Sequence, residues 1–162
     1  MINWIDLATG HGYAGIEMAA LLARLFGNRL HGRAGLLVLV ARVLSGVVFV
    51  VFSLGKFTRT DQYVADFGTF GLPESSLLVY LVGLLELIGG LMLVVGFLTR
   101  LAALGLGLDM VGAIVTAGIQ VGGPIHLVLA PTLAAAMLFL IWAGPGPYSI
   151  DARLAQRMVA PI

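Results

Sequence analysis

Three charged side chains interrupt long apolar stretches of the sequence and are its first candidates for chemistry. Arg42, Glu86 and Asp109 each stand inside an otherwise uncharged stretch of about the 20 residues that cross a bilayer as a helix. A charge at bilayer depth costs a few kcal/mol or more, so it usually faces a partner or a cavity. Counted at about 1.5 Å per residue along each helix, all three lie at similar depth. We therefore expect a buried ion-pair cluster of Arg42, Glu86 and Asp109.

This cluster is open to two interpretations. In the first, Arg42 neutralises Glu86 or Asp109 and only holds the helices together. In the second, one acid is left over beside a bound ligand or a proton path, because strongly perturbed buried acids gather at functional sites. The second interpretation makes Glu86 and Asp109 candidate proton relays.

A second set of polar residues is expected near the outer membrane surface. Lys56, Gln120 and His126 fall close to the outer ends of apolar stretches, and Thr116 shares a helix face with Asp109 and Gln120. These side chains could contact the headgroup of a ligand or a lipid, or simply anchor helix ends. His126 has no second histidine or acid at metal-ligand spacing, so we predict no metal site.

The composition identifies the kind of protein in which these residues act. Of 162 residues 60% are hydrophobic and 10% are charged, whereas a soluble domain has about 25% charged residues. The same values exclude intrinsic disorder, and a net charge of +1 argues against nucleic-acid binding. Cysteine is absent from the sequence, which excludes thiol redox chemistry and thiolate-held metal centres. The chain is expected to be an integral membrane protein.

The elements that must position the charges are four apolar segments. Thr99 and Arg100 leave almost no loop between the second and third segments, and 122–124 (Gly-Gly-Pro) turns the chain before the fourth. This pattern predicts an all-α, antiparallel bundle of four transmembrane helices over residues 34–143. The spans are 34–55, 75–98, 101–121 and 125–143, with an external loop at 56–74 whose aromatic residues suit the lipid headgroups.

Both ends of the chain are expected on the cytoplasmic side. Residues 1–33 suit an interfacial amphipathic helix or a tail packed on a neighbouring subunit. Residues 144–162 form a tail with a short surface helix, capped by Ser149 and with Asp151 in its first turn. Only Lys56 and Arg59 are basic on the loop side. The basic residues on the other side are Arg24, Arg29, Arg33, Arg100, Arg153 and Arg157. This excess places that side in the cytoplasm. The protein is expected in the cytoplasmic (inner) membrane of a bacterium or archaeon.

Six short stretches, in this order and spacing, resemble the DoxX family of small membrane proteins. In the stretch 144–152, Pro147 stands where the family pattern has a basic residue. Asp109 is an acid outside the pattern. The resemblance extends from Arg42 to Arg157. The stretches are 42–46 (RVLSG) followed by 55–57 (GKF), then 71–73 (GLP), 86–91 (ELIGGL), 96–103 (GFLTRLAA) and 144–152 (GPGPYSIDA).

The resemblance implies a four-helix membrane fold and a place in redox biology. Some DoxX proteins are associated with quinone-linked thiosulfate oxidation, and others with membrane complexes that handle oxidative stress beside a sulfurtransferase and a superoxide dismutase. Arg42, Lys56 and Glu86 match the family's polar positions, and Arg100 matches its hairpin. None of these positions has a settled catalytic role in the family.

The function expected from these observations is that of an accessory membrane subunit of an oxidoreductase or respiratory-type complex. It would be mainly structural, with a quinone or lipid contact at the buried polar cluster, no covalent cofactor, and partners in the bilayer and other membrane subunits. The isolated chain is not expected to be an enzyme. The alternative is a quinone-reducing subunit in which Glu86 or Asp109 relays protons, and a weaker alternative is a small-molecule transporter.

Overall fold

The computed structural model describes residues 26–30 and 32–159, and every regular element in these ranges is a helix. Four of the helical stretches, Arg33–Thr58, Ser76–Val95, Thr99–Gly118 and Ile125–Ala143, are long and apolar enough to cross a membrane. The predicted all-α membrane bundle with four spans is therefore confirmed. In chain order the elements are α3 (Arg33–Thr58), α4 (Thr60–Thr69), α5 (Ser76–Val95), α6 (Thr99–Ala113), η1 (Ile114–Gly118), η2 (Ile125–Leu129), α7 (Ala130–Ala143) and α8 (Ile150–Val159).

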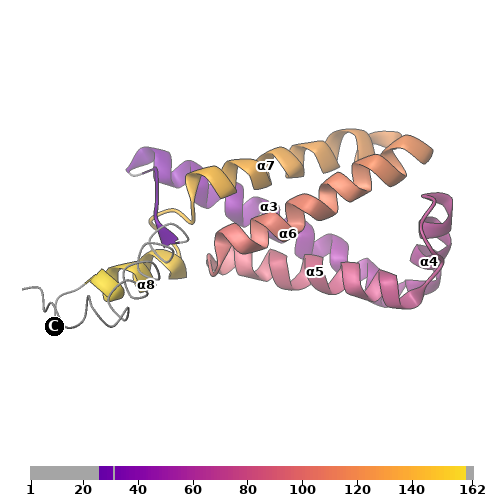
Figure 1. Ribbon diagram of the computed structural model, residues 1–162, viewed down its shortest axis with the longest axis horizontal. Coiled ribbons are helices and arrows are strands. Elements are labelled where there is room, and N and C mark those ends of the chain that lie inside the picture. Colours follow the sequence, from indigo (N-terminus) through magenta and orange to yellow (C-terminus); the bar gives the residue numbers. More distant parts are fainter. Residues whose placement is uncertain (1–25, 31, 160–162) are drawn as a thin grey trace, which may run out of the picture.

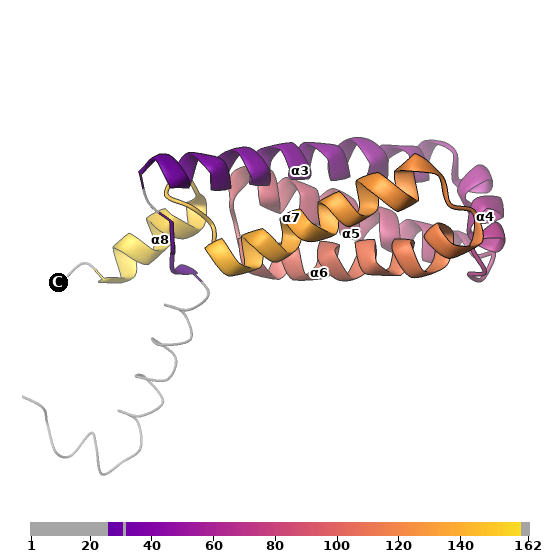
Figure 2. The same ribbon diagram turned by 90° about the horizontal axis from the view of Figure 1, so that it is seen from above.

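The four long helices lie side by side in an elongated bundle, with α4 across one end and α8 at the opposite end (Figures 1 and 2). The core between the helices is formed by large apolar side chains, among them Phe49, Leu106 and Met137, which are 1% exposed or less. The outer surface is also apolar. Leu37, Leu77, Leu108 and Leu138 are between 65% and 69% exposed, as expected for side chains that contact lipid.

Helices α3 and α5 are in backbone contact. A Cβ atom added to Gly46 would lie 2.7 Å from the carbonyl oxygen of Gly90, and one added to Gly90 would lie 2.8 Å from that of Gly46. Small residues allow membrane helices to approach this closely. The same face of α5 carries Gly83 and Glu86, and all three α5 residues are buried, so the glycines bring Glu86 against α3.

The helix ends follow from glycine and proline. Gly96 ends α5 in the left-handed conformation, with φ 72°, a common glycine-specific end of a helix. Leu98 also has positive φ, 45°, and α6 begins at the next residue. At the other end of the bundle, Gly122 (φ 70°) and Gly123 (φ 83°) make the turn before η2. Both turns are as short as the sequence predicts.

The segments outside the four spans are also helical where they are described. The stretch predicted as an external loop contains α4, which is joined to α3 by Arg59 alone. The N–H of Ala152 donates to the hydroxyl of Ser149 at 3.0 Å, so Ser149 caps α8 as predicted. Most of the predicted N-terminal amphipathic helix, in residues 1–33, lies outside the described residues.

Candidate functional site

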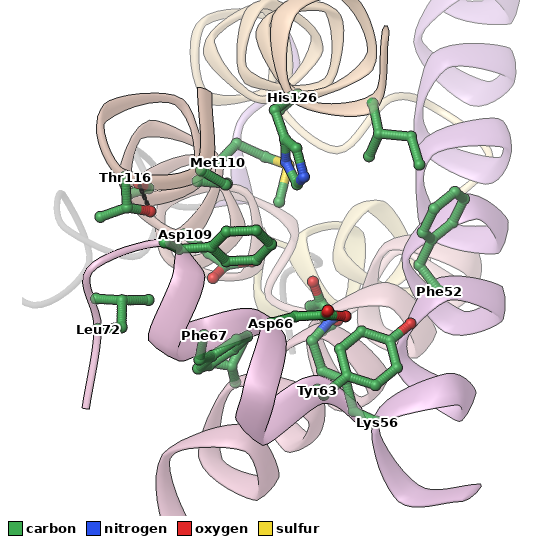
Figure 3. A pocket seen from close by; sticks show the side chains of 18 of the residues that line it. Phe52, Lys56, Tyr63, Asp66, Phe67, Leu72, Asp109, Met110, Thr116 and His126 are labelled. Atoms are coloured by element: carbon green, nitrogen blue, oxygen red, sulfur yellow. Dashed lines mark hydrogen bonds and ion pairs between the residues drawn. The ribbon is translucent and has the colours of Figure 1, made fainter. Parts of the chain in front are cut away.

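A cavity of about 440 Å³ lies inside the bundle at its α4 end. Its walls come from α3, α4, α5, α6 with η1, and η2 with α7, and Figure 3 shows side chains from several of these elements pointing into one space. Pockets that hold small molecules have volumes of about 300–1,000 Å³. The volume is therefore sufficient for the headgroup of a small organic ligand.

The polar centre of the cavity wall is an ion pair between Lys56 and Glu86. The ammonium of Lys56 donates to Oε2 of Glu86, and the two side chains are only 8% and 7% exposed. Lys56 also lies 5.4 Å from the ring centroid of Tyr63, a cation–π contact. Gly83 allows this approach, because a Cβ there would lie 3.2 Å from Cβ of Lys56.

Lys56 is predicted at the outer membrane rim, but the structure buries it. Helix α3 continues past residue 55 to Thr58, and α4 then folds back across its end. Gly55 permits this fold, because a Cβ at that position would lie 2.7 Å from the hydroxyl of Tyr63. The helix that covers Lys56 is formed by residues that the sequence assigns to a loop.

Asp109 faces the same cavity from α6 (Figure 3). Its carboxyl is close enough to Lys56 and Glu86 for the charges to interact. Its Oδ2 atom is buried and has no hydrogen-bond partner among the described residues. A buried polar atom without a partner is costly, and the large majority of such atoms are paired. Asp109 is therefore the side chain here with unused hydrogen-bonding capacity.

Arg42 is not part of this cluster, so the predicted grouping of Arg42, Glu86 and Asp109 is wrong. Fourteen residues separate Arg42 from Lys56 along α3, which is about 21 Å in a helix. The guanidinium of Arg42 donates instead to the carbonyl of Tyr148 at 2.6 Å and interacts with the charge of Asp151. The cation that neutralises Glu86 is Lys56.

The reason for this difference lies in residues 144–151, which fold back along α3. A Cβ at Gly35 would lie 2.7 Å from Cγ of Pro147, so the two segments are in contact. The Asp151 carboxylate accepts hydrogen bonds from the backbone N–H groups of Leu98 and Thr99, at 2.8 and 2.9 Å. It therefore caps α6, although the sequence predicts only that it stabilises the first turn of its own helix.

The other predicted site residues are divided between the cavity and its surroundings. Thr116 lines the cavity, but its hydroxyl donates to the carbonyl of Gly112 at 2.8 Å. His126 also lines the cavity and packs edge-on against Phe70, with ring centroids 5.2 Å apart. Gln120 is exposed and is not among the residues that line the cavity. Predictions about what these residues bind are not tested by their positions.

Several lining residues are not predicted from the sequence as site residues. Tyr63 and Phe67 reach the cavity from α4 (Figure 3), and Phe52 reaches it from α3. Two short π-helical stretches also border it, with Thr116 in η1 and His126 in η2. Such stretches are rare and occur often at functional sites. The aromatic spacing in residues 56–74 is the signal that could have revealed the α4 wall.

The fold and the cavity define the class of protein. Four membrane-spanning helices around an internal cavity with a buried ion pair make this chain a small multi-span membrane protein with an internal polar site. The described residues contain no group of three His, Asp or Glu side chains that could hold a metal ion. The family model described as DoxX matches residues 37–119, just over half of the chain. The chain belongs to the DoxX family, as its sequence motifs predict.

Three relatives are similar over much of their length. The chain is 34% identical over 145 residues to "Uncharacterized membrane protein Rv3486" of Mycobacterium tuberculosis, a match that covers 81% of this chain and 89% of the relative. It is 36% identical to "Inner membrane protein YqjF" of Escherichia coli, over 74% of this chain and 93% of the relative. It is 37% identical to "Putative oxidoreductase CatD" of Bacillus subtilis, over 48% and 57%. No solved structure matches the chain.

Proposed function

We propose that this protein is an inner-membrane subunit of an oxidoreductase assembly and that its cavity binds the headgroup of a lipophilic quinone. The observation that carries the proposal is the cavity of about 440 Å³ with the Lys56–Glu86 pair and Asp109 in its wall. The names of two relatives, an inner membrane protein and a putative oxidoreductase, support the same assignment. Both ends of the chain would lie in the cytoplasm.

The chemistry of the cavity wall suits such a ligand. A quinone combines a planar ring, two polar oxygens and an apolar tail. Rings of Phe52, Tyr63 and Phe67 border the cavity, and aromatic pairs contribute about 0.5–1.5 kcal/mol beyond the area they bury. The chain has no cysteine and so no thiolate-held redox centre, and the electrons for any reduction would come from a bound cofactor or from a partner subunit.

The test is direct quinone binding by the purified protein and by a variant with a filled cavity. Equilibrium dialysis would measure the binding of ubiquinone-1 to the protein in lipid nanodiscs, against empty nanodiscs. Gly112 lines the cavity, and a Cβ added to it meets no atom within 4 Å. Gly112→Leu should therefore occupy ligand space without disturbing the backbone and weaken binding at least about tenfold, which corresponds to about 1.4 kcal/mol.

The matched control is Val111→Leu, which enlarges the neighbouring side chain of the same helix on its exposed face, where Val111 is 50% exposed. This variant should bind ubiquinone-1 as the wild type does. If the wild type binds no quinone, or if Gly112→Leu binds it as tightly as Val111→Leu, the proposal is wrong.

A second candidate function, quinone reduction with an acid of this chain as proton relay, is favoured by the unpartnered Oδ2 of Asp109. Reduction of a quinone to a hydroquinone consumes two electrons, from the partner subunit, and two protons from water, which Asp109 or Glu86 would take up one at a time and pass to the ring oxygens. Asp109→Asn and Glu86→Gln should then abolish quinone-dependent turnover of the isolated complex while the complex still assembles. Loss of assembly, measured by mass spectrometry of co-purifying subunits, would instead indicate a structural role.

A further inference from the structure

We propose that the cavity binds the reduced, hydroxyl-bearing form of its ligand more tightly than the oxidised form, because Asp109 accepts a hydrogen bond from a ring hydroxyl. This inference rests on the proposed function and specifies the ligand: a hydroquinone or a related lipophilic phenol. It follows from which donors and acceptors around the cavity are already engaged.

The hydrogen-bond donors beside Asp109 are directed at protein atoms. The ammonium of Lys56 donates to Glu86, and the hydroxyl of Thr116 donates to the backbone carbonyl of Gly112 at 2.8 Å. Both residues line the cavity. A ligand oxygen that can only accept can still pair with a remaining N–H of the Lys56 ammonium, which has three donors, but it offers no hydrogen to an acceptor in the wall.

The acceptor beside these donors is free. The carboxyl of Asp109 interacts with Glu86, but its Oδ2 atom is buried and has no hydrogen-bond partner among the described residues, and in the ionised carboxylate this oxygen can only accept. The hydroxyl of a hydroquinone supplies the missing hydrogen. A quinone carbonyl at the same place would set a second acceptor against this oxygen and leave Oδ2 unsatisfied, which is costly for a buried polar atom.

The remaining polar groups of the cavity wall either can pair with both forms or are open to solvent. The amide of Gln62, the hydroxyl of Tyr63 and the ring of His126 each present a donor and an acceptor, so each can pair with either a hydroxyl or a carbonyl. Arg59 can only donate and the Asp66 carboxylate can only accept, but Arg59 is exposed and Asp66 is partly exposed, so water can pair with both. The difference between the reduced and oxidised ligands therefore depends on Asp109. Sites built to pair a ligand hydroxyl reject analogues without it strongly.

The experiment compares two ligand pairs in nanodiscs by equilibrium dialysis. The first pair is ubiquinol-1 and ubiquinone-1 under anaerobic conditions. The second pair, 1-naphthol and 1-methoxynaphthalene, does not change redox state and differs only in the donated hydrogen. We expect the wild-type protein to bind each hydroxyl compound at least about tenfold more tightly than its partner.

Asp109→Asn is the informative variant, because an amide offers both a donor and an acceptor. It should lower the preference for each hydroxyl compound to less than about threefold while ubiquinone-1 still binds. Asp61→Asn is the matched control, since Asp61 lies on α4, is exposed and is not among the residues that line the cavity, and it should leave the preference unchanged.

The outcomes separate the two proposals. Binding of ubiquinone-1 as tight as that of ubiquinol-1, or tighter, would overturn the inference and leave quinone binding intact, because Asp109 would then be donating a proton to a carbonyl. A preference that persists in Asp109→Asn would also overturn it. Failure of all four ligands to bind the wild type would overturn the proposed function itself.

Discussion

Gly96→Ala is the substitution whose effect the structure specifies most closely. A Cβ added to Gly96 would lie 2.6 Å from both Cζ of Arg42 and Cβ of Ser149, and closer still to Nη1 of Arg42. Real Cβ atoms essentially never approach below 3.0 Å. The guanidinium must therefore move, although Arg42 is only 1% exposed and donates to the carbonyl of Tyr148 at 2.6 Å.

The expected loss of stability has two parts. Gly96 has φ 72°, and a left-handed conformation costs a non-glycine residue about 1–2 kcal/mol. A hydrogen bond from a charged group contributes about 1.5–3 kcal/mol, and Arg42 would lose that bond. Gly96→Ala should therefore destabilise the protein by about 2.5–5 kcal/mol in total, since the two parts act on different atoms.

The control is Gly123→Ala. The difference in stability between the two variants isolates the second part, the lost hydrogen bond of Arg42. Gly123 has φ 83°, and a Cβ there meets no atom within 4 Å, so this variant has the backbone strain without the displacement of Arg42. In thermal unfolding of the detergent-solubilised protein by circular dichroism, Gly96→Ala should melt about 3–12 °C below Gly123→Ala. Equal melting temperatures would refute the assignment of Arg42. In an Arg42→Met background, the additional effect of Gly96→Ala should shrink, because both changes remove one interaction.

Three further predictions concern the same fold. Lys56→Met leaves the Glu86 carboxylate buried without its cation, so it should destabilise the protein by about 3–5 kcal/mol, and adding Glu86→Leu should restore most of that in a thermal melt. Gly46→Ala should lower the melting temperature relative to Gly112→Ala, because only the first places its Cβ within 2.7 Å of a backbone oxygen, and overpacking costs about 1–3 kcal/mol. Asp151→Ala should cost about 1–2 kcal/mol in chemical unfolding, as expected for loss of a helix cap, and no change in that measurement would contradict the capping role.

The membrane helices could be predicted from the sequence because hydropathy alone determines which segments cross a bilayer. The predicted first span, 34–55, differs from α3 (Arg33–Thr58) mainly at its end. There the apolar stretch gives way to Lys56, and a charge in a hydropathy pattern indicates the end of a span. The helix nevertheless continues, because Glu86 from α5 neutralises that charge. A long-range contact of this kind leaves no local signal.

The identity of the ion pair could not be predicted for a related reason. Counting residues places Arg42, Glu86 and Asp109 at similar depth, but the partner of a buried charge depends on which segments fold back into the bundle. Residues 144–151 return to Arg42, and α4 covers Lys56 with the ring of Tyr63. Asp109 can be predicted as a candidate site residue because a single acid in an apolar helix is conspicuous at any depth.

The two buried cations have different surroundings, and the difference indicates where function lies. Arg42 is packed against Gly96, donates to the carbonyl of Tyr148 and has the charge of Asp151 nearby. Its Nε and Nη1 atoms are buried without a hydrogen-bond partner among the described residues, and it is not among the residues that line the cavity. Lys56 lines a cavity of about 440 Å³ together with two acids. Protein interiors are close-packed, and each unfilled volume lowers stability, so an ion pair needed only for packing would be surrounded by side chains. The open space bordered by Lys56, Glu86 and Asp109 therefore supports the proposal that a ligand binds there.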